Sequence, residues 1–389
     1  MKPGQSSGGV LLVLSMAMFC AMLGVGVISP ILPLFARELG ASGFLLGLIF
    51  GSFSFSRSVG MFISGELAEH VDRKILLLAG LSVYALSSVA YTFAGSTSAL
   101  ILIRLGHGFG SAMVVPITMA VGADIAAKGE EGLFFGTLQG ALFLGIGFGP
   151  LLSGVLADMS GIKAPFLAMT ALTVLSLAMV ARFLPFSRSG AELRAGTGMA
   201  SAMRGLMTDH VMVPVFIFQF CSAMTRGTLL MMIPLFAAGL NLSFTQIGVI
   251  LSLNSLSTGI LQRFSGRLAD RLRKNRLIFL GGIIPSITLL GLPFLRTPVS
   301  LSLASIAFGV GHAFSSPSLA AVAALRSRTY GSGRTMGLFN ISFSLGMSAG
   351  PVIAGTLLDI SRSEAPFFFL SAMLASASVL FLVGRLREI

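Results

Sequence analysis

Three polar residues share one face of an otherwise apolar segment. Arg104, His107 and Ser111 are spaced i, i+3 and i+7, which places them on one side of a helix. An arginine in the middle of a membrane costs at least about 2.5 kcal/mol to insert, so it is not expected to face lipid. Histidine is the side chain whose charge changes nearest neutral pH. The three residues therefore predict a buried site that binds substrate or carries a proton, with a structural arginine bonded to backbone carbonyls as the alternative.

Two further arginines, Arg57 and Arg226, also fall inside apolar segments, whereas all 14 Asp and Glu residues fall near segment ends or in loops. A buried charge without a counter-ion is costly. These arginines therefore favour a neutral or anionic substrate, or arginine heads that reach a water-filled cavity. Without a buried carboxylate, His107 and His312 are the candidate proton carriers. The candidate binding and coupling residues are Arg57, Arg104, His107, Ser111, Gln139, Arg226, Asn254, His312 and Asn340.

The composition of the chain indicates that these residues lie in helices that span a membrane. Of the 389 residues, 54% are hydrophobic and 10% are charged, whereas a soluble domain carries about 25% charged residues. Soluble enzymes, nucleic-acid binders and disordered proteins are therefore disfavoured. A membrane helix needs roughly 20 apolar residues. Twelve such spans are predicted, at about 9–36, 44–66, 75–95, 97–122, 132–157, 163–185, 210–237, 244–267, 276–295, 298–323, 334–359 and 364–385.

The basic residues predict the orientation of these spans. Of the 26 Lys and Arg residues, three lie within spans and 19 lie on the side of the N-terminus. The four on the opposite side are Arg37, Lys163, Arg296 and Arg362. This distribution follows the positive-inside rule and accounts for the net charge of +12 without nucleic acid. We therefore expect a multi-pass protein of a cell membrane, in particular a bacterial inner membrane, with both termini in the cytoplasm.

The chain repeats itself at an offset of 201 residues. Residues 33–36 match residues 234–237, and residues 145–154 match residues 346–355. Even Cys20 and Cys221 are related by this offset; both are expected to be buried thiols that neither bind metal nor form a disulfide. Parallel repeats of this kind are typical of transporters whose two halves rock against each other.

The repeat predicts the domain organisation. We expect an all-α membrane protein of twelve transmembrane helices in two pseudo-symmetric six-helix bundles, at 1–185 and 210–389. A cytoplasmic linker at 186–209 joins them; it is polar and too short to form a domain.

The loop after the second span resembles a motif of the major facilitator superfamily. Residues 65–74 are similar to the family's Gly-x-Leu-Ala-Asp-Arg-x-Gly-Arg-Lys loop, with Glu69, His70 and Asp72 as departures. A second copy starts at Gly266. The first glycine of the motif is expected to let helices approach closely. In the family this loop latches the outward-facing state, and the resemblance implies a conformational latch made by Gly65, Glu69, Arg73, Asp124, Gly266, Asp270 and Arg271.

Two membrane segments carry further motifs of this family. Residues 104–112 resemble its Arg-x-x-Gln-Gly-x-Gly-Ala motif, whose arginine is tied to proton coupling in proton-coupled members. Residues 145–154 resemble the Gly-x-x-x-Gly-Pro-x-x-Gly-Gly motif associated with antiporters. Small residues at this spacing allow close helix packing, which is the simpler explanation, but the motif favours export. The residues of this antiporter motif and its repeat are Gly145, Gly149, Pro150, Gly154, Gly350 and Pro351.

The resemblance covers the whole chain and implies a twelve-helix drug:proton antiporter. We expect secondary active transport by alternating access, with proton-coupled efflux of a small amphipathic compound or drug. An organic-anion carrier for uptake or exchange, using the intramembrane arginines, is the alternative, and a non-transporting membrane sensor or scaffold is a third. An enzyme is not expected, because the Gly-x-Ser-x-Gly pattern at 346–350 lies inside a span and no metal-ligand cluster is found. The expected partners are a small-molecule substrate and the lipid bilayer, with a proton gradient instead of a cofactor and a monomeric chain.

Overall fold

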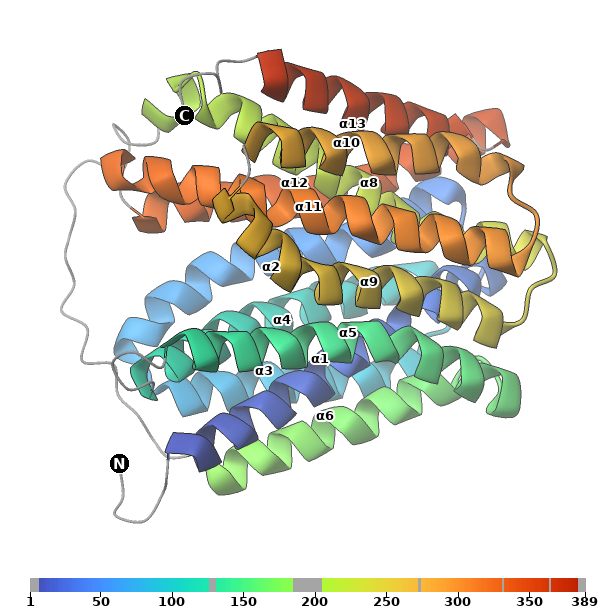
Figure 1. Ribbon diagram of the computed structural model, residues 1–389. Coiled ribbons are helices and arrows are strands. Elements are labelled where there is room, and N and C mark those ends of the chain that lie inside the picture. The colour runs from blue at the N-terminus through green and yellow to red at the C-terminus, as the bar shows by residue number, and fades with distance from the viewer. Residues whose placement is uncertain are drawn as a thin grey trace. The chain divides into compact units, whose positions relative to one another are not determined.

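The fold is built from long helices. The computed structural model describes residues 7–125, 131–184, 205–271, 274–330, 332–363 and 365–383, and most of them lie in the helices drawn in Figure 1. A one-turn 3-10 helix, η1 (Leu292–Phe294), follows α10. The long helices are α1 (Ser7–Glu38), α2 (Gly43–His70), α3 (Arg73–Phe93), α4 (Thr97–Ile125), α5 (Glu131–Ser160), α6 (Ala164–Phe183), α8 (Met212–Gly239), α9 (Phe244–Arg271), α10 (Lys274–Gly291), α11 (Pro298–Tyr330), α12 (Ser332–Ser361) and α13 (Ala365–Val383).

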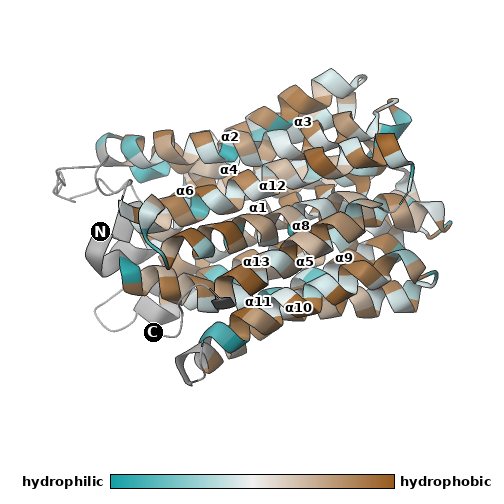
Figure 2. Ribbon diagram, turned by 90° about the horizontal axis from the view of Figure 1, so that it is seen from above, coloured by the Kyte–Doolittle hydropathy of each residue, from teal (hydrophilic) through white to brown (hydrophobic). Residues whose placement is uncertain are grey.

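These helices correspond one to one to the twelve predicted spans. Eleven of the described helices are long and apolar enough to cross a membrane, and α13 contributes a shorter apolar stretch, Ala365–Phe381. Figure 2 shows hydrophobic residues along the helices and most of the strongly hydrophilic residues towards helix ends. Backbone groups in lipid must be satisfied within the segment, which a helix achieves. The chain is therefore an all-α, multi-pass membrane protein, as the sequence predicts.

The described chain divides into two compact units. Unit 1 comprises Met1–Ala41, Ser52–Glu192 and Ile233–Ser252, and unit 2 comprises Ser42–Gly51, Leu193–Met232 and Leu253–Ile389. Within unit 1, α1 packs against α5 and α6, and α3 packs against α4 and α6. Within unit 2, α10 packs against α11 and α13, and α12 contacts the same two helices.

Two helices are shared by the units in equivalent ways. The first residues of α2, up to Gly51, belong to unit 2, and the rest of α2 belongs to unit 1. Helix α9 shows the reverse assignment, because its residues up to Ser252 belong to unit 1 and those from Leu253 belong to unit 2. Gly51 and Ser252 are separated by 201 residues, so the division of α2 and α9 follows the repeat in the sequence.

Helix packing inside the two units also follows the repeat. The Ser64 hydroxyl donates to the Ala112 carbonyl at 3.0 Å, joining α2 to α4. At the positions 201 residues later, the Ser265 hydroxyl donates to the Ala313 carbonyl, joining α9 to α11. Hydroxyl groups of this kind hold membrane helices together where apolar contact alone gives little preference over lipid.

Left-handed backbone conformations mark equivalent turns. In the described residues, positive φ occurs at Gly40 (78°) and Asn241 (58°), which follow α1 and α8. It also occurs at Gly161 (86°) and Arg362 (49°), which follow α5 and α12. Each pair is related by the 201-residue offset. Glycine adopts this conformation without strain, whereas a residue with a Cβ atom does not. The two repeats therefore use the same turns with different residues.

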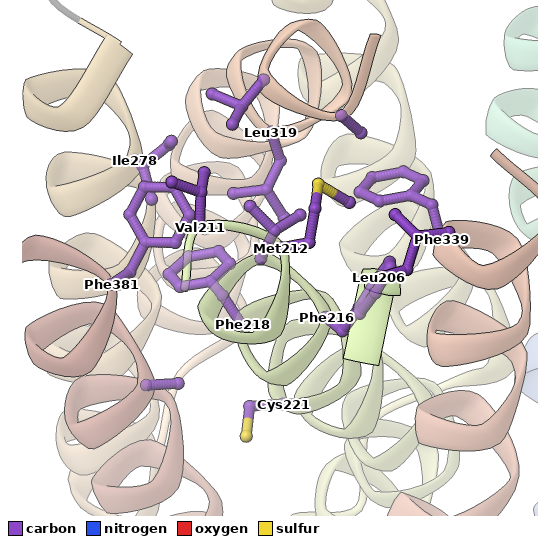
Figure 3. Close-up of a cluster of buried hydrophobic side chains, with 14 of the residues drawn as sticks. Leu206, Val211, Met212, Phe216, Phe218, Cys221, Ile278, Leu319, Phe339 and Phe381 are labelled. Carbon is purple, nitrogen blue, oxygen red and sulfur yellow. The ribbon is translucent and has the colours of Figure 1, made fainter. Parts of the chain in front are cut away.

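A cluster of apolar side chains from several helices fills one end of unit 2 (Figure 3). The Phe218 and Phe381 rings pack edge to face, with centroids 5.9 Å apart. Met212, Leu319 and Phe339 pack into the same cluster, which joins α8 to α11, α12 and α13. Cys221 lies at the edge of this cluster, and both cysteines are buried free thiols, as the sequence predicts.

Candidate functional site

The predicted polar face of the 104–111 segment is buried inside unit 1. The exposed fractions of Arg104, His107 and Ser111 on α4 are 7%, 0% and 2%. The side chains therefore face neighbouring helices and not lipid, which agrees with the cost of placing an arginine in hydrocarbon.

Three aromatic rings enclose the His107 imidazole. The ring centroids of Tyr84, Phe53 and Tyr91 lie 4.4, 5.0 and 6.1 Å from that of His107, each in an edge-to-face arrangement. The His107 Nδ1 atom lies 3.4 Å from the Tyr91 hydroxyl, and within the described residues its Nε2 atom has no hydrogen-bond partner. A buried polar atom left in this way calls for a hydrogen-bond partner, such as a water molecule or a polar group of a ligand.

Aromatic groups also surround Arg104. Its guanidinium carbon lies 4.3 Å from the centroid of the Phe53 ring, which is a cation–π contact. Its charge also interacts with the Tyr91 hydroxyl. Arg57 of α2 is half-buried and, like Arg104, interacts electrostatically with Tyr84. The structure thus brings Arg57, Arg104 and His107 into one cluster.

Sequence reasoning missed the aromatic members of this cluster. The chain has only three tyrosines, and two of them, Tyr84 and Tyr91, lie seven residues apart on α3 and pack on the same histidine. Because tyrosine is rare in this chain and the spacing of seven places both rings on one side of a helix, the pair could have been recognised in the sequence as candidate site residues. Phe53 had no such signal, because it is one of 32 phenylalanines.

A second polar cluster lies inside unit 2. The Ser222 hydroxyl of α8 lies 3.5 Å from Nδ1 of His312 on α11. Arg226, one turn further along α8, is close enough to His312 for their charges to interact. Neither α8 nor α11 contains an Asp or Glu residue. This cluster therefore has two groups that can be positive and no carboxylate on the helices that carry them.

The other candidate residues have varied surroundings. Asn254 is buried on α9, and its amide nitrogen donates to the Ser305 carbonyl at 3.0 Å, which is a helix-to-helix contact. The repeat-related residues Gln139 and Asn340 are both exposed, on α5 and α12. Their side chains are therefore not buried against neighbouring helices.

Glycines of the predicted antiporter motif contact backbone directly. A Cβ atom at Gly145 would lie 2.6 Å from the Phe19 carbonyl oxygen, and one at Gly149 would lie 2.6 Å from that of Leu23. These contacts join α5 to α1 within unit 1. Only glycine allows this approach, because any side chain would overlap the neighbouring main chain.

The same contacts recur in unit 2. A Cβ atom at Gly346 or Gly350 would overlap the Phe220 or Met224 carbonyl oxygen on α8. Each of these four residues lies 201 positions after its counterpart in unit 1. The α5–α1 and α12–α8 contacts are therefore one packing arrangement used twice.

Two carboxylates cap the N-termini of α2 and α9. Asp158, in the last turn of α5, accepts from the backbone N–H groups of Phe244 and Thr245 at 3.0 and 2.8 Å. Asp359, in the last turn of α12, accepts from those of Gly43 and Phe44 at 2.7 and 2.8 Å. Carboxylates at a helix N-terminus satisfy free N–H groups and complement the positive end of the helix dipole. The two aspartates are separated by 201 residues, so this cap is another feature of the repeat.

The predicted latch is described only in part. Arg73 donates to the Ala120 carbonyl of α4 at 3.1 Å, so it reaches the end of α4 that carries Asp124. The side chains of Glu69, Asp124, Asp270 and Arg271 lie outside the described residues. The close helix approach expected at Gly65 and Gly266 is not found: no described atom lies within 4 Å of a Cβ atom at either position. The motif glycines that do mediate close packing are those of α5 and α12.

Comparison with known proteins identifies the family. The model of the Major Facilitator Superfamily matches residues 14–213 and 215–388, which is nearly the whole chain. The chain belongs to the Major Facilitator Superfamily. It is 30% identical over 345 residues to the MFS-type transporter MJ1560 of Methanocaldococcus jannaschii, covering 88% of this chain and 89% of that protein.

Other members of the Major Facilitator Superfamily are similar over different lengths. The multi-drug resistance efflux pump PmrA homolog of Lactococcus lactis is 27% identical over 340 residues, covering 85% of this chain and 84% of that protein. The quinolone resistance protein NorA of Staphylococcus aureus is 29% identical over 167 residues, 43% of each chain. The solved structure of the nucleoside transporter NupG has a TM-score of 0.82 at 13% identity, covering 97% of this chain and all of NupG, and it supports the fold alone.

Proposed function

We propose that this membrane transporter is a proton-coupled exporter of small amphipathic compounds, working by alternating access. The observation that carries the proposal is the resemblance of residues 145–154 to the antiporter-type motif, whose glycines pack α5 on α1 and, in the repeat, α12 on α8. The names of the PmrA homolog and NorA, a multi-drug efflux pump and a quinolone resistance protein, support the same direction of transport. We further propose that the membrane is a bacterial inner membrane with both termini in the cytoplasm, since the basic residues gather on that side.

His107 is the proton carrier in this proposal. Its imidazole is fully buried among three rings and lies one helical turn from Arg104. A positive charge added there must be compensated, because a buried charge next to another of the same sign is costly. Proton uptake by His107 would therefore be linked to a rearrangement of α2, α3 and α4, whose side chains form the cluster. That link is what coupling a proton to a conformational change requires.

A flux assay in proteoliposomes tests this function. The purified chain is reconstituted with a pH dye trapped inside, and ethidium, a quinolone and fluorescein are added in turn as cationic, zwitterionic and anionic probes. We expect the cation or the quinolone to drive proton movement, and Arg104→Gln to abolish it. Transport of any probe without proton movement would overturn the coupling, and transport of fluorescein alone would overturn the substrate class.

An organic-anion carrier is the second candidate, and the unit 2 cluster favours it. Arg226, Ser222 and His312 form a polar group that lacks a carboxylate on its own helices, so the negative charge of a ligand would complement it. The human organic anion transporter MFSD10 has a similar fold, with a TM-score of 0.67 at 18% identity over 97% of this chain and 100% of that chain. In the same assay this candidate predicts uptake or exchange of fluorescein that is lost in Arg226→Gln and kept in Arg104→Gln.

A further inference from the structure

Three buried polar atoms of unit 1 have no hydrogen-bond partner among the described residues. They are Nε of Arg57, the hydroxyl oxygen of Tyr84 and Nε2 of His107, on α2, α3 and α4. Tyr84 and His107 are fully buried, and their ring centroids lie 4.4 Å apart. Buried polar groups without partners are rare in native proteins. The proton-carrier role proposed for His107 leaves Arg57 and Tyr84 without a task.

The three atoms call for a negatively charged acceptor. Arg57 Nε–H and Tyr84 O–H donate hydrogen bonds, and His107 Nε2 donates when it carries a proton. The charges of Arg57 and Arg104 both act on the Tyr84 hydroxyl, and Ser111 lies near the same hydroxyl. An anion at this position would accept from the free donors and compensate both guanidinium groups.

The described residues do not supply this acceptor to Arg57 and Tyr84. The charges that act on these two residues are their own, that of Arg104 and that of Tyr91. Helix α3 contains no Asp or Glu residue, and the acidic residues of α2 and α4 lie in their last two turns. On α2 the nearest is Glu66, which follows Arg57 by nine positions, or roughly 14 Å along a helix. The negative charge therefore has to come from a ligand.

The packing around Tyr84 favours a small ion. Its side chain is fully buried, and a Cβ atom at Gly110 of α4 would lie only 3.1 Å from its Cδ2 atom. An organic anion of substrate size has no room beside a ring packed in this way. A strongly hydrated anion such as sulfate costs more to bury than a halide. Arg57 is half-buried, so a small ion reaches the hydroxyl along its side chain.

We propose that unit 1 binds one monovalent inorganic anion of the halide class, such as chloride, between Arg57 and Tyr84. The ion accepts from Arg57 Nε–H and from the Tyr84 hydroxyl, with Arg104 adding a second positive charge. It also places a negative charge near His107, which compensates the proton that this imidazole carries in the proposed function. The site goes beyond that function, because binding of the ion requires no transported substrate.

Tyrosine fluorescence of the full chain in lipid nanodiscs tests the site. The chain has no tryptophan and three tyrosines, so Tyr330→Phe leaves Tyr84 and Tyr91 as the emitting residues. Iodide, which quenches a neighbouring tyrosine, is titrated against gluconate at constant ionic strength. We expect saturable quenching that chloride reverses and that sulfate and benzoate do not. Quenching that rises linearly and ignores chloride would overturn the site, and reversal by benzoate as efficient as that by chloride would overturn the assignment to a small ion.

Substitution of one arginine in each unit locates the ion. Arg57→Gln should weaken iodide binding about tenfold or more, because it removes a hydrogen bond from a charged donor. Arg226→Gln is the matched control, since Arg226 is also a half-buried arginine inside a predicted span but belongs to unit 2. It should leave the iodide affinity unchanged. An unchanged affinity in Arg57→Gln, or an equal loss in Arg226→Gln, would overturn the proposal.

A measurement on the unmodified chain covers the case in which Arg57→Gln fails to fold. An ion that binds the folded chain alone raises its stability. The thermal unfolding temperature should therefore be higher in chloride than in gluconate at equal ionic strength, and the difference should shrink in Tyr84→Phe, which removes only the hydroxyl group. Equal unfolding temperatures of the unmodified chain in the two salts would overturn the proposal. Because no transport is measured, failure here is distinct from failure of the exporter assignment, which the flux assay decides.

Discussion

The guanidinium carbon of Arg104 lies 4.3 Å from the centre of the Phe53 ring. The residues 201 positions later are Ser305 and Asn254, and there the Asn254 amide donates to the Ser305 carbonyl at 3.0 Å. The same helix crossing thus carries a cation–π contact in unit 1 and a neutral hydrogen bond in unit 2. The two repeats agree in their glycine packing and differ in the polar residues at this crossing.

The Arg104–Phe53 contact should contribute measurably to stability. We expect Phe53→Leu to weaken it, since cation–π contacts are worth about 0.5–2 kcal/mol depending on their exposure. A double-mutant cycle with Arg104→Gln, followed by thermal unfolding in detergent, isolates the pairwise energy from the loss of packing. We expect a coupling energy of about 1 kcal/mol in unit 1. Strictly additive effects of the two substitutions would contradict this.

Replacement of His107 should separate packing from proton coupling. Its repeat mate is Phe308, a buried aromatic residue at the equivalent position of α11. We therefore expect His107→Phe to fold with an unfolding temperature close to that of the unmodified chain and to lose substrate-driven proton movement in proteoliposomes. His312→Ser, which copies the repeat mate Ser111, is the control and should retain proton movement. Full proton movement in His107→Phe would show that the imidazole only fills space.

Alanine at the glycine contacts should destabilise the transporter, whereas alanine elsewhere on the same helix should not. A Cβ atom at Gly149 would lie 2.6 Å from the Leu23 carbonyl oxygen, while one at Gly136 or Gly140 meets no described atom within 4 Å. Overpacking of this kind costs about 1–3 kcal/mol, so Gly149→Ala should lower the thermal unfolding temperature. Gly136→Ala and Gly140→Ala should leave it equal or slightly higher, because alanine favours helix. Equal unfolding temperatures for all three variants would mean that the α5–α1 contact has room for a Cβ atom and would contradict this prediction.

The left-handed turns predict stabilising substitutions. Arg362 has a φ of 49°, and its repeat mate, which is the glycine Gly161, has a φ of 86°. Relief of this strain should make Arg362→Gly more stable by about 1 kcal/mol, as seen by a higher thermal unfolding temperature. Asn241→Gly should gain less, since asparagine tolerates this conformation better. Gly161→Ala is the converse test and should lower the unfolding temperature; a rise there would contradict the assigned backbone strain.

Much of the fold could be predicted from the sequence. The twelve spans follow from hydropathy, because each helix must satisfy its own backbone in lipid whatever its neighbours are. The Arg104–His107–Ser111 face was also predictable, since three residues on one helix share a side whatever that helix packs against. The repeat at 201 residues predicted equivalent contacts, as found at Gly145 and Gly346.

Contacts between helices were harder to predict from the sequence. Gly65 and Gly149 both belong to family-like motifs and looked equally suited to close packing, yet only Gly149 lies against backbone of another helix. Tyr84 and Tyr91 surround His107 from α3, although no motif includes them. Asp158 and Asp359 cap helices that start 86 and 316 positions away in the sequence. Which residues meet depends on the rotation of each helix about its axis.

The sequence by itself determined the membrane environment, the number of helices, the family and the polar residues available for transport. Each of these depends on composition, on spacing along one helix or on similarity along the chain. Only the tertiary structure decided that aromatic rings enclose His107, that Ser222 and Arg226 neighbour His312, and that two aspartates hold α9 and α2. The physical reason is that these helices are apolar nearly all round, so their hydropathy does not specify which face meets which neighbour.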